Sequence, residues 1–245
     1  MKISIICVYN NLESLNAQLL NAFNQFKRDN YELILVDSVK LGFSCSSDAL
    51  NYGASISTGN VLIFTHQDIY IKNEEDFFKF CLFISEEEIG TIVGAAGAIE
   101  KNKTNYTNYT TGKVLNLSFI NIYKNICEVA CVDESFFGMR VETYDNHHFD
   151  NNLCDDWHLY AVEASLYARK NGKKVIVYPI QIHHYSNGTI SIKYWIGLLK
   201  IADTYRKHFK YIWTTCYKVR SSKLYTRVLF ALWYLHRKII GKELG

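Results

Sequence analysis

The first seventy residues alternate short apolar runs with amphipathic segments, and this alternation constrains the fold more than any other feature. The runs Lys2–Val8, Tyr31–Val36 and Val61–Thr65 are rich in β-branched residues, as is typical of strands covered on both faces. Between them, Asn10–Phe26 places leucines and phenylalanines at helical spacing, and Ser47–Ser57 carries helix start and stop signals. Strands separated by helices of this length predict an α/β fold with a parallel sheet.

The sequence after residue 70 predicts further helices and strands, followed by a different C-terminal part. The expected elements are a helix at Asn73–Glu88, a strand at Gly90–Ile99, a polar loop at Lys101–Lys113, a hairpin formed by Val114–Tyr123 and Ile126–Val132, a strand at Ser135–Val141, a helix at Asp156–Gly172 and a strand at Lys174–Ile182. From Ser191 onward we expect only helical, aromatic and basic segments. The sequence thus predicts an α/β domain at 1–190 and a helical, basic extension at 191–245.

Composition excludes several classes of protein. The chain has 245 residues, of which 49% are apolar and 21% charged, so it is too apolar for a disordered chain and long enough to bury a large core. The apolar run at the N-terminus is too short for a signal peptide, and no stretch reaches the roughly 18 apolar residues of a membrane span. The seven cysteines are scattered without the spacing of a zinc site. We therefore expect a cytoplasmic protein with reduced thiols.

Two acidic residues directly follow predicted strands. Asp37 comes after the second strand, and Asp68 ends the polar triplet His66-Gln67-Asp68 after the third. Ligands of parallel sheets bind beyond the carboxyl ends of the strands, so Asp68 could bind a divalent metal that neutralises a diphosphate, and Asp37 could bind a ribose or a base. The alternative is that each residue closes a turn or caps a helix.

Two further groups of residues could join these acids. His183 and His184 follow the last predicted strand and offer a nitrogen ligand or a phosphate contact, although a surface histidine is the alternative for either one. Asp155 and Asp156 begin the predicted helix 156–172, where acids are stabilised by the positive helix N-terminus without any catalytic role. A general base facing the same cleft is the functional reading of this segment.

The order of these features resembles that of family 2 glycosyltransferases of GT-A fold. The matching features are Val8-Tyr9-Asn10 after the first strand, Val36-Asp37, Asn51-x-Gly53, Gly59-Asn60-Val61, His66-Gln67-Asp68 and the late His184-Tyr185-Ser186. The resemblance runs from about residue 2 to residue 190 and is greatest to a bacterial glycosyltransferase-like branch that carries His-Gln-Asp in place of Asp-x-Asp. It implies a mixed, mainly parallel, Rossmann-like sheet flanked by helices.

The resemblance also implies a role for each matching position. The nucleotide sugar would be bound by Val8, Tyr9, Asn10, Asp37, Asn51, Gly53, His66 and Gln67. A divalent cation, Mn²⁺ or Mg²⁺, would be bound by Asp68 together with His184 or, alternatively, His183. The acceptor side would include Asp133, Glu134 and Trp157.

The sequence departs from the family at the catalytic base. Inverting family 2 enzymes carry Glu-Asp before the helix that ends at a glycine, but alignment on Gly172 puts Ala161 where the aspartate should be. The candidates for the base are therefore Asp156, His158 and Glu163, of which Asp156 is preferred. The implied reaction is an inverting, metal-dependent transfer from a nucleotide sugar, most simply a UDP-sugar, to a saccharide or lipid-linked acceptor in surface polysaccharide or glycoconjugate synthesis.

Other functions remain open at this stage. A nucleotidyltransferase shares the topology, but Cys7–Leu12 contains neither the glycine nor the basic residue that would hold a triphosphate. A Rossmann dehydrogenase lacks its Gly-x-Gly-x-x-Gly fingerprint here. The non-enzymatic alternative is a nucleotide-sugar-binding or membrane-docking subunit with a degenerate site.

The formal charge of +3 combines two unlike parts of the chain. Residues 186–245 hold twelve Lys/Arg and two acids, whereas residues 1–185 hold fifteen basic and twenty-two acidic residues. Arg227–Ile240 has the apolar and basic content of an interfacial helix, which could dock on anionic lipid at the inner face of the membrane. The alternative is a C-terminal helix packed on the domain with solvated lysines. No nucleic-acid-binding motif accompanies this charge, so we expect no nucleic acid partner.

Overall fold

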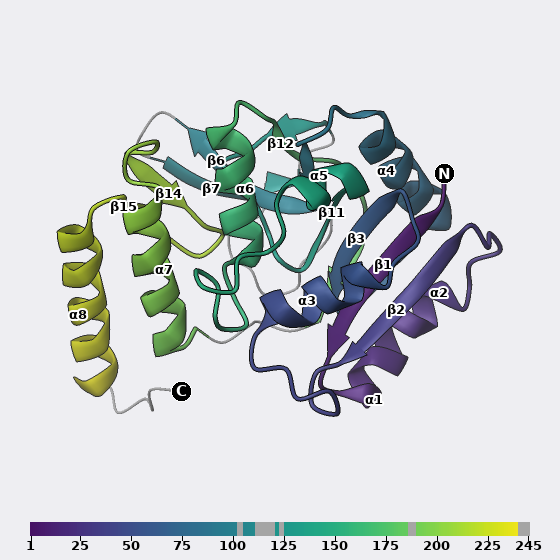
Figure 1. The fold of residues 1–245 in the computed structure, drawn as a ribbon, viewed down its shortest axis with the longest axis horizontal. Coiled ribbons are helices and arrows are strands. Elements are labelled where there is room, and N and C mark those ends of the chain that lie inside the picture. The colour runs from purple at the N-terminus through teal and green to yellow at the C-terminus, as the bar shows by residue number, and fades with distance from the viewer. Residues whose placement is uncertain (102–104, 111–120, 123–124, 186–189, 240–245) are drawn as a thin grey trace.

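The computed structural model describes residues 1–101, 105–110, 121–122, 125–185 and 190–239, and it has an α/β fold (Figure 1). The central seven-stranded sheet has the order β2-β1-β3-β11-β5-β12-β9. Five of its strands run in the same direction, and β11 and β9 run opposite to them. The mixed, mainly parallel sheet expected from the sequence is therefore confirmed.

The central sheet and its helices are regular at the N-terminal end and more broken after it. The strands of the central sheet are β1 (Ile3–Tyr9), β2 (Tyr31–Asp37), β3 (Val61–His66), β5 (Ile92–Gly94), β9 (Cys127–Glu128), β11 (Phe136–Arg140) and β12 (Val175–Val177). The helical segments are α1 (Leu12–Leu15), the π-helical turn η1 (Asn16–Leu20), α2 (Asn21–Phe23), α3 (Ser46–Ser55), α4 (Glu74–Glu86), α5 (Val141–Asn146), α6 (Tyr160–Lys170), α7 (Ile192–Thr204) and α8 (Lys223–Ile239).

Three smaller sheets complete the fold. Their strands are β10 (Cys131–Val132), β6 (Ala96–Lys101), β7 (Asn105–Thr110) and β8 (Asn121–Ile122) in one sheet, β13 (Ile182–His184) and β4 (Ile69–Ile71) in the second, and β14 (Tyr211–Trp213) and β15 (Lys218–Arg220) in the third.

Alternating side chains of β1 enter two separate hydrophobic cores, because successive residues of a strand point to opposite faces of the sheet. Ile3 and Ile5 pack with residues of the 12–23 helical segment and α4, whereas Ile6 packs with α3, α6 and α7. At Gly53 of α3, an added Cβ would lie 2.5 Å from Ile6 Cγ2. The fold therefore has three layers, and α3 needs a glycine to lie this close to the sheet.

The predicted strand Gly90–Ile99 is two strands in different sheets, β5 and β6, which are separated at Ala95. Part of the predicted loop Lys101–Lys113 is the strand β7, which pairs with β6. Tertiary pairing overrides the low strand propensity of its asparagines, since pairing satisfies the backbone donors and acceptors.

The predicted hairpin is also wrong in its described part. Ile126–Val132 contains β9, which pairs with β12, and β10, which pairs with β6. Most of the other predicted arm, 114–123, lies outside the described residues. The predicted strand Lys174–Ile182 is interrupted around Pro179, which has no N–H to donate to a ladder, and the chain resumes as β13 against β4.

After Ser191 the structure has the helices α7 and α8, as expected, and between them the hairpin β14–β15, which the sequence did not predict. Trp195, Leu198 and Ile201 of α7 belong to the same core as α3 and α6. The division of the chain at residue 190 stays a prediction. Among the described helices, we find none with the length and apolar content needed to cross a membrane.

Candidate active site

A pocket of about 220 Å³ lies at the carboxyl ends of β1 and β3. Among its lining residues, those predicted from the sequence are Val8, Tyr9, Asn10, His66, Gln67, Asp68, Trp157 and His158. The pocket is also lined by residues that were not predicted as site residues from the sequence, namely Ser38, Ser46, Leu50, Thr65 and Tyr160. The position of this pocket is the one expected for a ligand site of a parallel sheet.

Gln67 fixes one wall of this pocket. Its side-chain oxygen accepts hydrogen bonds from the backbone N–H groups of Asn10 (3.0 Å) and Asn11 (2.9 Å). Its side-chain amide donates to Asn10 Oδ1 over 2.9 Å. The residue after β3 therefore holds the loop after β1 in place, and the motif His66-Gln67-Asp68 has a local structural role beside any ligand contact.

Three potential metal ligands meet at the end of β3. The β4–β13 ribbon pairs His184 with Ile69, the residue after Asp68, and brings His184 Nε2 to 3.4 Å from Asp68 Oδ1. One potential ligand atom from each of His66, Asp68 and His184 lies within 4.8 Å of the others. His183 is the neighbour of His184 in the strand and belongs to the opposite face, so the structure brings His184 rather than His183 to Asp68.

The three groups have the chemistry of a divalent metal site. Burial and the nearby His184 lower the pKa of His66 to about 4, so the His66 ring is neutral at pH 7 and keeps a lone pair. Burial acts to lower the pKa of His184, but the hydrogen bond and charge of Asp68 outweigh it and raise that pKa. Two imidazoles and a carboxylate favour a transition-metal ion over Mg²⁺, which prefers oxygen ligands.

Tyr160, which the sequence reading missed, contacts this group from the start of α6. Its hydroxyl lies 3.2 Å from His66 Nε2 and 3.3 Å from the backbone oxygen of Glu134. Burial, together with the charge of Glu134, raises the pKa of Tyr160 well above its usual value, so the hydroxyl stays neutral. A neutral hydroxyl that donates to the Glu134 carbonyl can accept from the ring and orient His66.

Asp133 and Glu134 are half-buried neighbours in the chain, and Glu134 contacts His158. Burial acts to raise the pKa of Asp133, but hydrogen bonds from Ser135 and Thr215 outweigh it and lower that pKa. Burial raises the pKa of Glu134, whose carboxylate accepts from the Leu159 N–H and lies 3.4 Å from His158 Nδ1. The environments of two neighbouring carboxyl groups thus shift their pKa values in opposite directions.

The segment before α6 is an irregular loop, and the helix predicted at Asp156–Gly172 begins only at Tyr160. Leu159 has φ of 75°, a left-handed conformation that is strained for a leucine. Ser46 Oγ donates to the Asp156 carbonyl over 3.0 Å, and Ser47 Oγ donates to the Cys154 carbonyl over 3.0 Å. The loop is therefore held by α3 on one side and by Glu134 on the other.

Only one of the three candidate bases lines the pocket, and it is His158. Asp156 is 8% exposed and lies beside the start of α7, where its carboxylate accepts from Ser191 Oγ over 3.3 Å. Glu163 is 1% exposed, accepts a hydrogen bond from Tyr205 over 2.5 Å and lies 2.9 Å from His147 Nε2. Glu163 therefore lies in the core, away from the residues that line the pocket.

We expect Glu163→Ala to lower the free energy of unfolding by about 3 kcal/mol or more, because it leaves His147 and Tyr205 without their shared partner and opens a void. A thermal melt should show a fall of roughly 6 °C or more. Glu86→Ala, at an exposed position of α4, is the matched control and should change little. An unchanged melting temperature combined with complete loss of sugar transfer would instead support Glu163 as the base.

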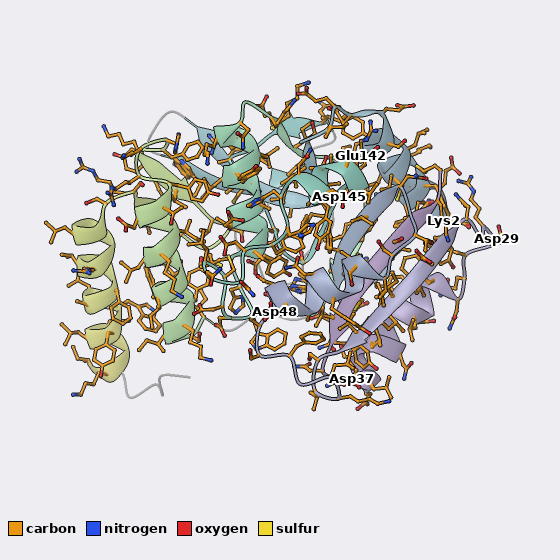
Figure 2. The ribbon with its side chains drawn as sticks, viewed as in Figure 1. Lys2, Asp29, Asp37, Asp48, Glu142 and Asp145 are labelled. Atoms are coloured by element: carbon orange, nitrogen blue, oxygen red, sulfur yellow. The ribbon has the colours of Figure 1, made fainter. Side chains whose placement is uncertain are left out.

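Three residues that were predicted to contact the nucleotide sugar have structural roles in this fold, namely Asp37, Asn51 and Gly53. Asp37 Oδ1 accepts from the N–H groups of Val39 and Lys40, which closes the turn after β2. Figure 2 shows Asp37 at the end of β2, and Asp145 of α5 toward the opposite end of the sheet. Partial burial raises the pKa of Tyr9, and so does the Asp37 carboxylate, to which the Tyr9 hydroxyl donates a hydrogen bond. Asp37 thus contacts a pocket residue without lining the pocket itself.

Asn51 and Gly53 lie on α3 outside the pocket lining. Asn51 Oδ1 accepts from the Tyr144 hydroxyl over 2.8 Å, and its amide donates to the Phe149 carbonyl over 2.9 Å. Gly53 allows the close approach of α3 to β1. Both residues therefore stabilise the packing of α3, and it is the first half of that helix, at Ser46 and Leu50, that reaches the pocket.

Solved structures of glycosyltransferases share this fold. No curated protein sequence matches the chain significantly. GalNAc-T7, solved with UDP, GalNAc and Mn²⁺, aligns with a TM-score of 0.59 at 13% identity over 84% of this chain and 48% of its own. Residues 1–349 of TarS from S. aureus, in complex with UDP-GlcNAc, align with a TM-score of 0.53 at 15% identity over 82% of this chain and 66% of that one.

A mannosyltransferase from Pyrobaculum calidifontis, in complex with GDP-Man and Mn²⁺, aligns with a TM-score of 0.56 at 13% identity over 85% of this chain and 65% of its own. The chain thus spans about half to two thirds of the length of these structures. At such identities the likeness shows the shared GT-A fold. The sequence profile of the glycosyltransferase-like family matches residues 4–219, which is most of the chain, and the chain therefore belongs to this family.

Proposed function

We propose that the chain transfers a sugar from a nucleotide-sugar donor to a hydroxyl group of a saccharide or lipid-linked acceptor. The observation that carries this proposal is the cluster of His66, Asp68 and His184 beside a pocket at the carboxyl ends of parallel strands. UDP, UDP-GlcNAc and GDP-Man are the ligands of three proteins with this fold, and they support a nucleoside diphosphate donor. Surface polysaccharide or glycoconjugate synthesis at the inner face of the membrane is the process that we propose.

The proposed metal is Mn²⁺, bound by His66, Asp68 and His184. Its two imidazole ligands favour it over Mg²⁺, and two of the similar structures contain Mn²⁺. A divalent cation at this position supplies positive charge that offsets the negative charge of the departing nucleoside diphosphate. The donor, which we propose to be a UDP-sugar, would lie along the wall formed by Val8, Tyr9 and the loop that Gln67 fixes.

We propose His158 as the general base, positioned by Glu134. His158 lines the pocket, and Glu134 Oε2, which lies 3.4 Å from His158 Nδ1, would orient the imidazole ring toward an acceptor hydroxyl. The acceptor oxygen forms a bond to the anomeric carbon while the bond from that carbon to the diphosphate breaks, and the hydroxyl proton moves to the His158 ring. A displacement of this kind inverts the anomeric configuration.

A nucleotide melting panel tests this function. With saturating UDP and Mn²⁺ we expect the melting temperature to rise by roughly 5 °C, because ligand that binds only the folded state stabilises it. GDP with Mn²⁺ tests the other donor class, and CTP, NAD and UDP with EDTA are the controls. The rate at which free UDP is released from a mixture of UDP-sugars is then measured, and a higher rate with the enzyme than without it would show turnover. The proposal fails if no nucleoside diphosphate shifts the melting temperature.

A further inference from the structure

The outer face of α8 carries an exposed apolar stripe. Its residues follow one another at intervals of three or four and are between 49% and 82% exposed, namely Leu224, Val228, Leu232, Leu235 and Ile239. At this spacing they share one face of the helix. α8 lies at the edge of the molecule beside α7 (Figure 1), and Trp233 on its other face packs against Trp195 at a ring distance of 5.8 Å. The helix is thus anchored by one face and presents apolar side chains on the opposite one.

Positive charge surrounds this stripe. Arg227 and Lys238 are exposed and lie along one edge of the stripe in the helical projection. Arg220 of β15, just before α8, is also exposed. Residues 186–245 hold twelve Lys/Arg against two acids, whereas the remainder of the chain is net negative. The stripe therefore lies within the cationic part of the chain.

We propose that this face of α8 binds an anionic lipid surface. Leucine and isoleucine side chains flanked by arginine and lysine match the acyl boundary and the negatively charged headgroups of such a surface. A second copy of the chain is the competing occupant, but pairing two such stripes would bring the cationic segments of both copies together. Charge complementarity thus favours the lipid surface.

The docking face is connected to the acceptor side of the site. β15 leads directly into α8, and the turn between β14 and β15 contains Thr215, which donates a hydrogen bond to Asp133. Glu134, which follows Asp133 in the chain, lies 3.4 Å from His158, the proposed base. Given the proposed function, a docked α8 would hold this hairpin and the acceptor side close to the membrane, where a lipid-linked acceptor would be presented.

Vesicle flotation tests the docking. We expect the full chain to float with vesicles of phosphatidylglycerol and phosphatidylcholine. With vesicles of pure phosphatidylcholine it should remain in the bottom fraction of the gradient. Two double variants, Leu232→Glu with Leu235→Glu and Arg227→Glu with Lys238→Glu, should each lower the bound fraction roughly tenfold or more. Leu82→Glu, at an exposed position of α4, is the matched control and should float like the unmodified chain.

The docking proposal is overturned by any of three results. Failure of the unmodified chain to float removes it, and equal flotation of all variants assigns the binding to another surface. Dimers in light scattering that disappear in Leu232→Glu with Leu235→Glu, without flotation, assign the stripe to a second copy. The UDP–Mn²⁺ melting shift is measured on the unmodified chain and on the same variants. An unmodified chain that shows the shift but does not float overturns only the docking, whereas variants that lose flotation and keep the shift support it. Flotation without any shift overturns only the proposed transferase function.

Discussion

We expect Asp68→Asn to lower the rate of sugar transfer on the order of 10³-fold or more while the protein stays folded. The Asp68 side chain is the carboxylate of the three-residue cluster, and asparagine keeps its shape but loses the negative charge that binds a cation. The same change should weaken Mn²⁺ binding by about 10-fold to 100-fold, which isothermal titration with the metal alone measures independently of activity.

The matched control for this variant is Asp145→Asn, which removes an exposed carboxylate from α5, toward the opposite end of the sheet (Figure 2). It should retain both transfer and Mn²⁺ binding. If Asp68→Asn keeps full activity and the Mn²⁺ affinity of the unmodified chain, the metal assignment is wrong. Loss of transfer with unchanged Mn²⁺ affinity would mean that Asp68 acts on the substrate and not through the cation.

The second large effect is expected for His158→Gln, which should lower kcat by roughly 10²-fold to 10⁴-fold with little change in the donor KM. Glutamine can keep the hydrogen bond to Glu134 but cannot accept the acceptor proton. Asp156→Asn should lower kcat by less than about tenfold, because the Asp156 carboxylate contacts Ser191 at the start of α7 rather than the pocket. Steady-state transfer assays with donor and acceptor varied separately measure both effects.

An exposed histidine provides the control for the base. His148→Gln changes a side chain that stacks on Tyr144 outside the pocket and should leave kcat unchanged. Added imidazole should partly restore His158→Gln if a missing proton acceptor is the defect. A near-complete loss of kcat in Asp156→Asn together with an active His158→Gln would return the base to Asp156, the residue preferred from the sequence.

The N-terminal strands and the positions of the polar residues at their ends could be predicted from the sequence. The runs Lys2–Val8, Tyr31–Val36 and Val61–Thr65 correspond to β1, β2 and β3, because a strand buried on both faces needs an unbroken apolar run. Since these strands are parallel, residues after β1 and β3 meet at one edge, and the pocket lies there. The same reasoning could not separate Asp37, which closes a turn, from Asp68, since both follow a strand.

The proposed base, and the place of His66 among the potential metal ligands, could not be predicted in this way. Helical periodicity places Asp156 on a helix, but Ser46, Ser47 and Glu134 hold this segment as a loop that exposes Trp157 and His158 to the pocket. Glu163, a candidate base from the sequence, is a core residue that contacts His147 and Tyr205. These outcomes depend on partners far away in the sequence.

The sequence by itself determined the α/β class, the first three strands, the polar triplet after β3 and the cationic C-terminal part. These features depend on the periodicity of apolar side chains, on turn-forming residues and on the distribution of charged residues, all of which are local properties of the sequence. Only the tertiary structure decided that His184 rather than His183 meets Asp68, that Tyr160 contacts His66 and that the apolar stripe of α8 faces outward. Each of these depends on strand register and packing, which are set by the summed contacts of distant segments and by no single local pattern.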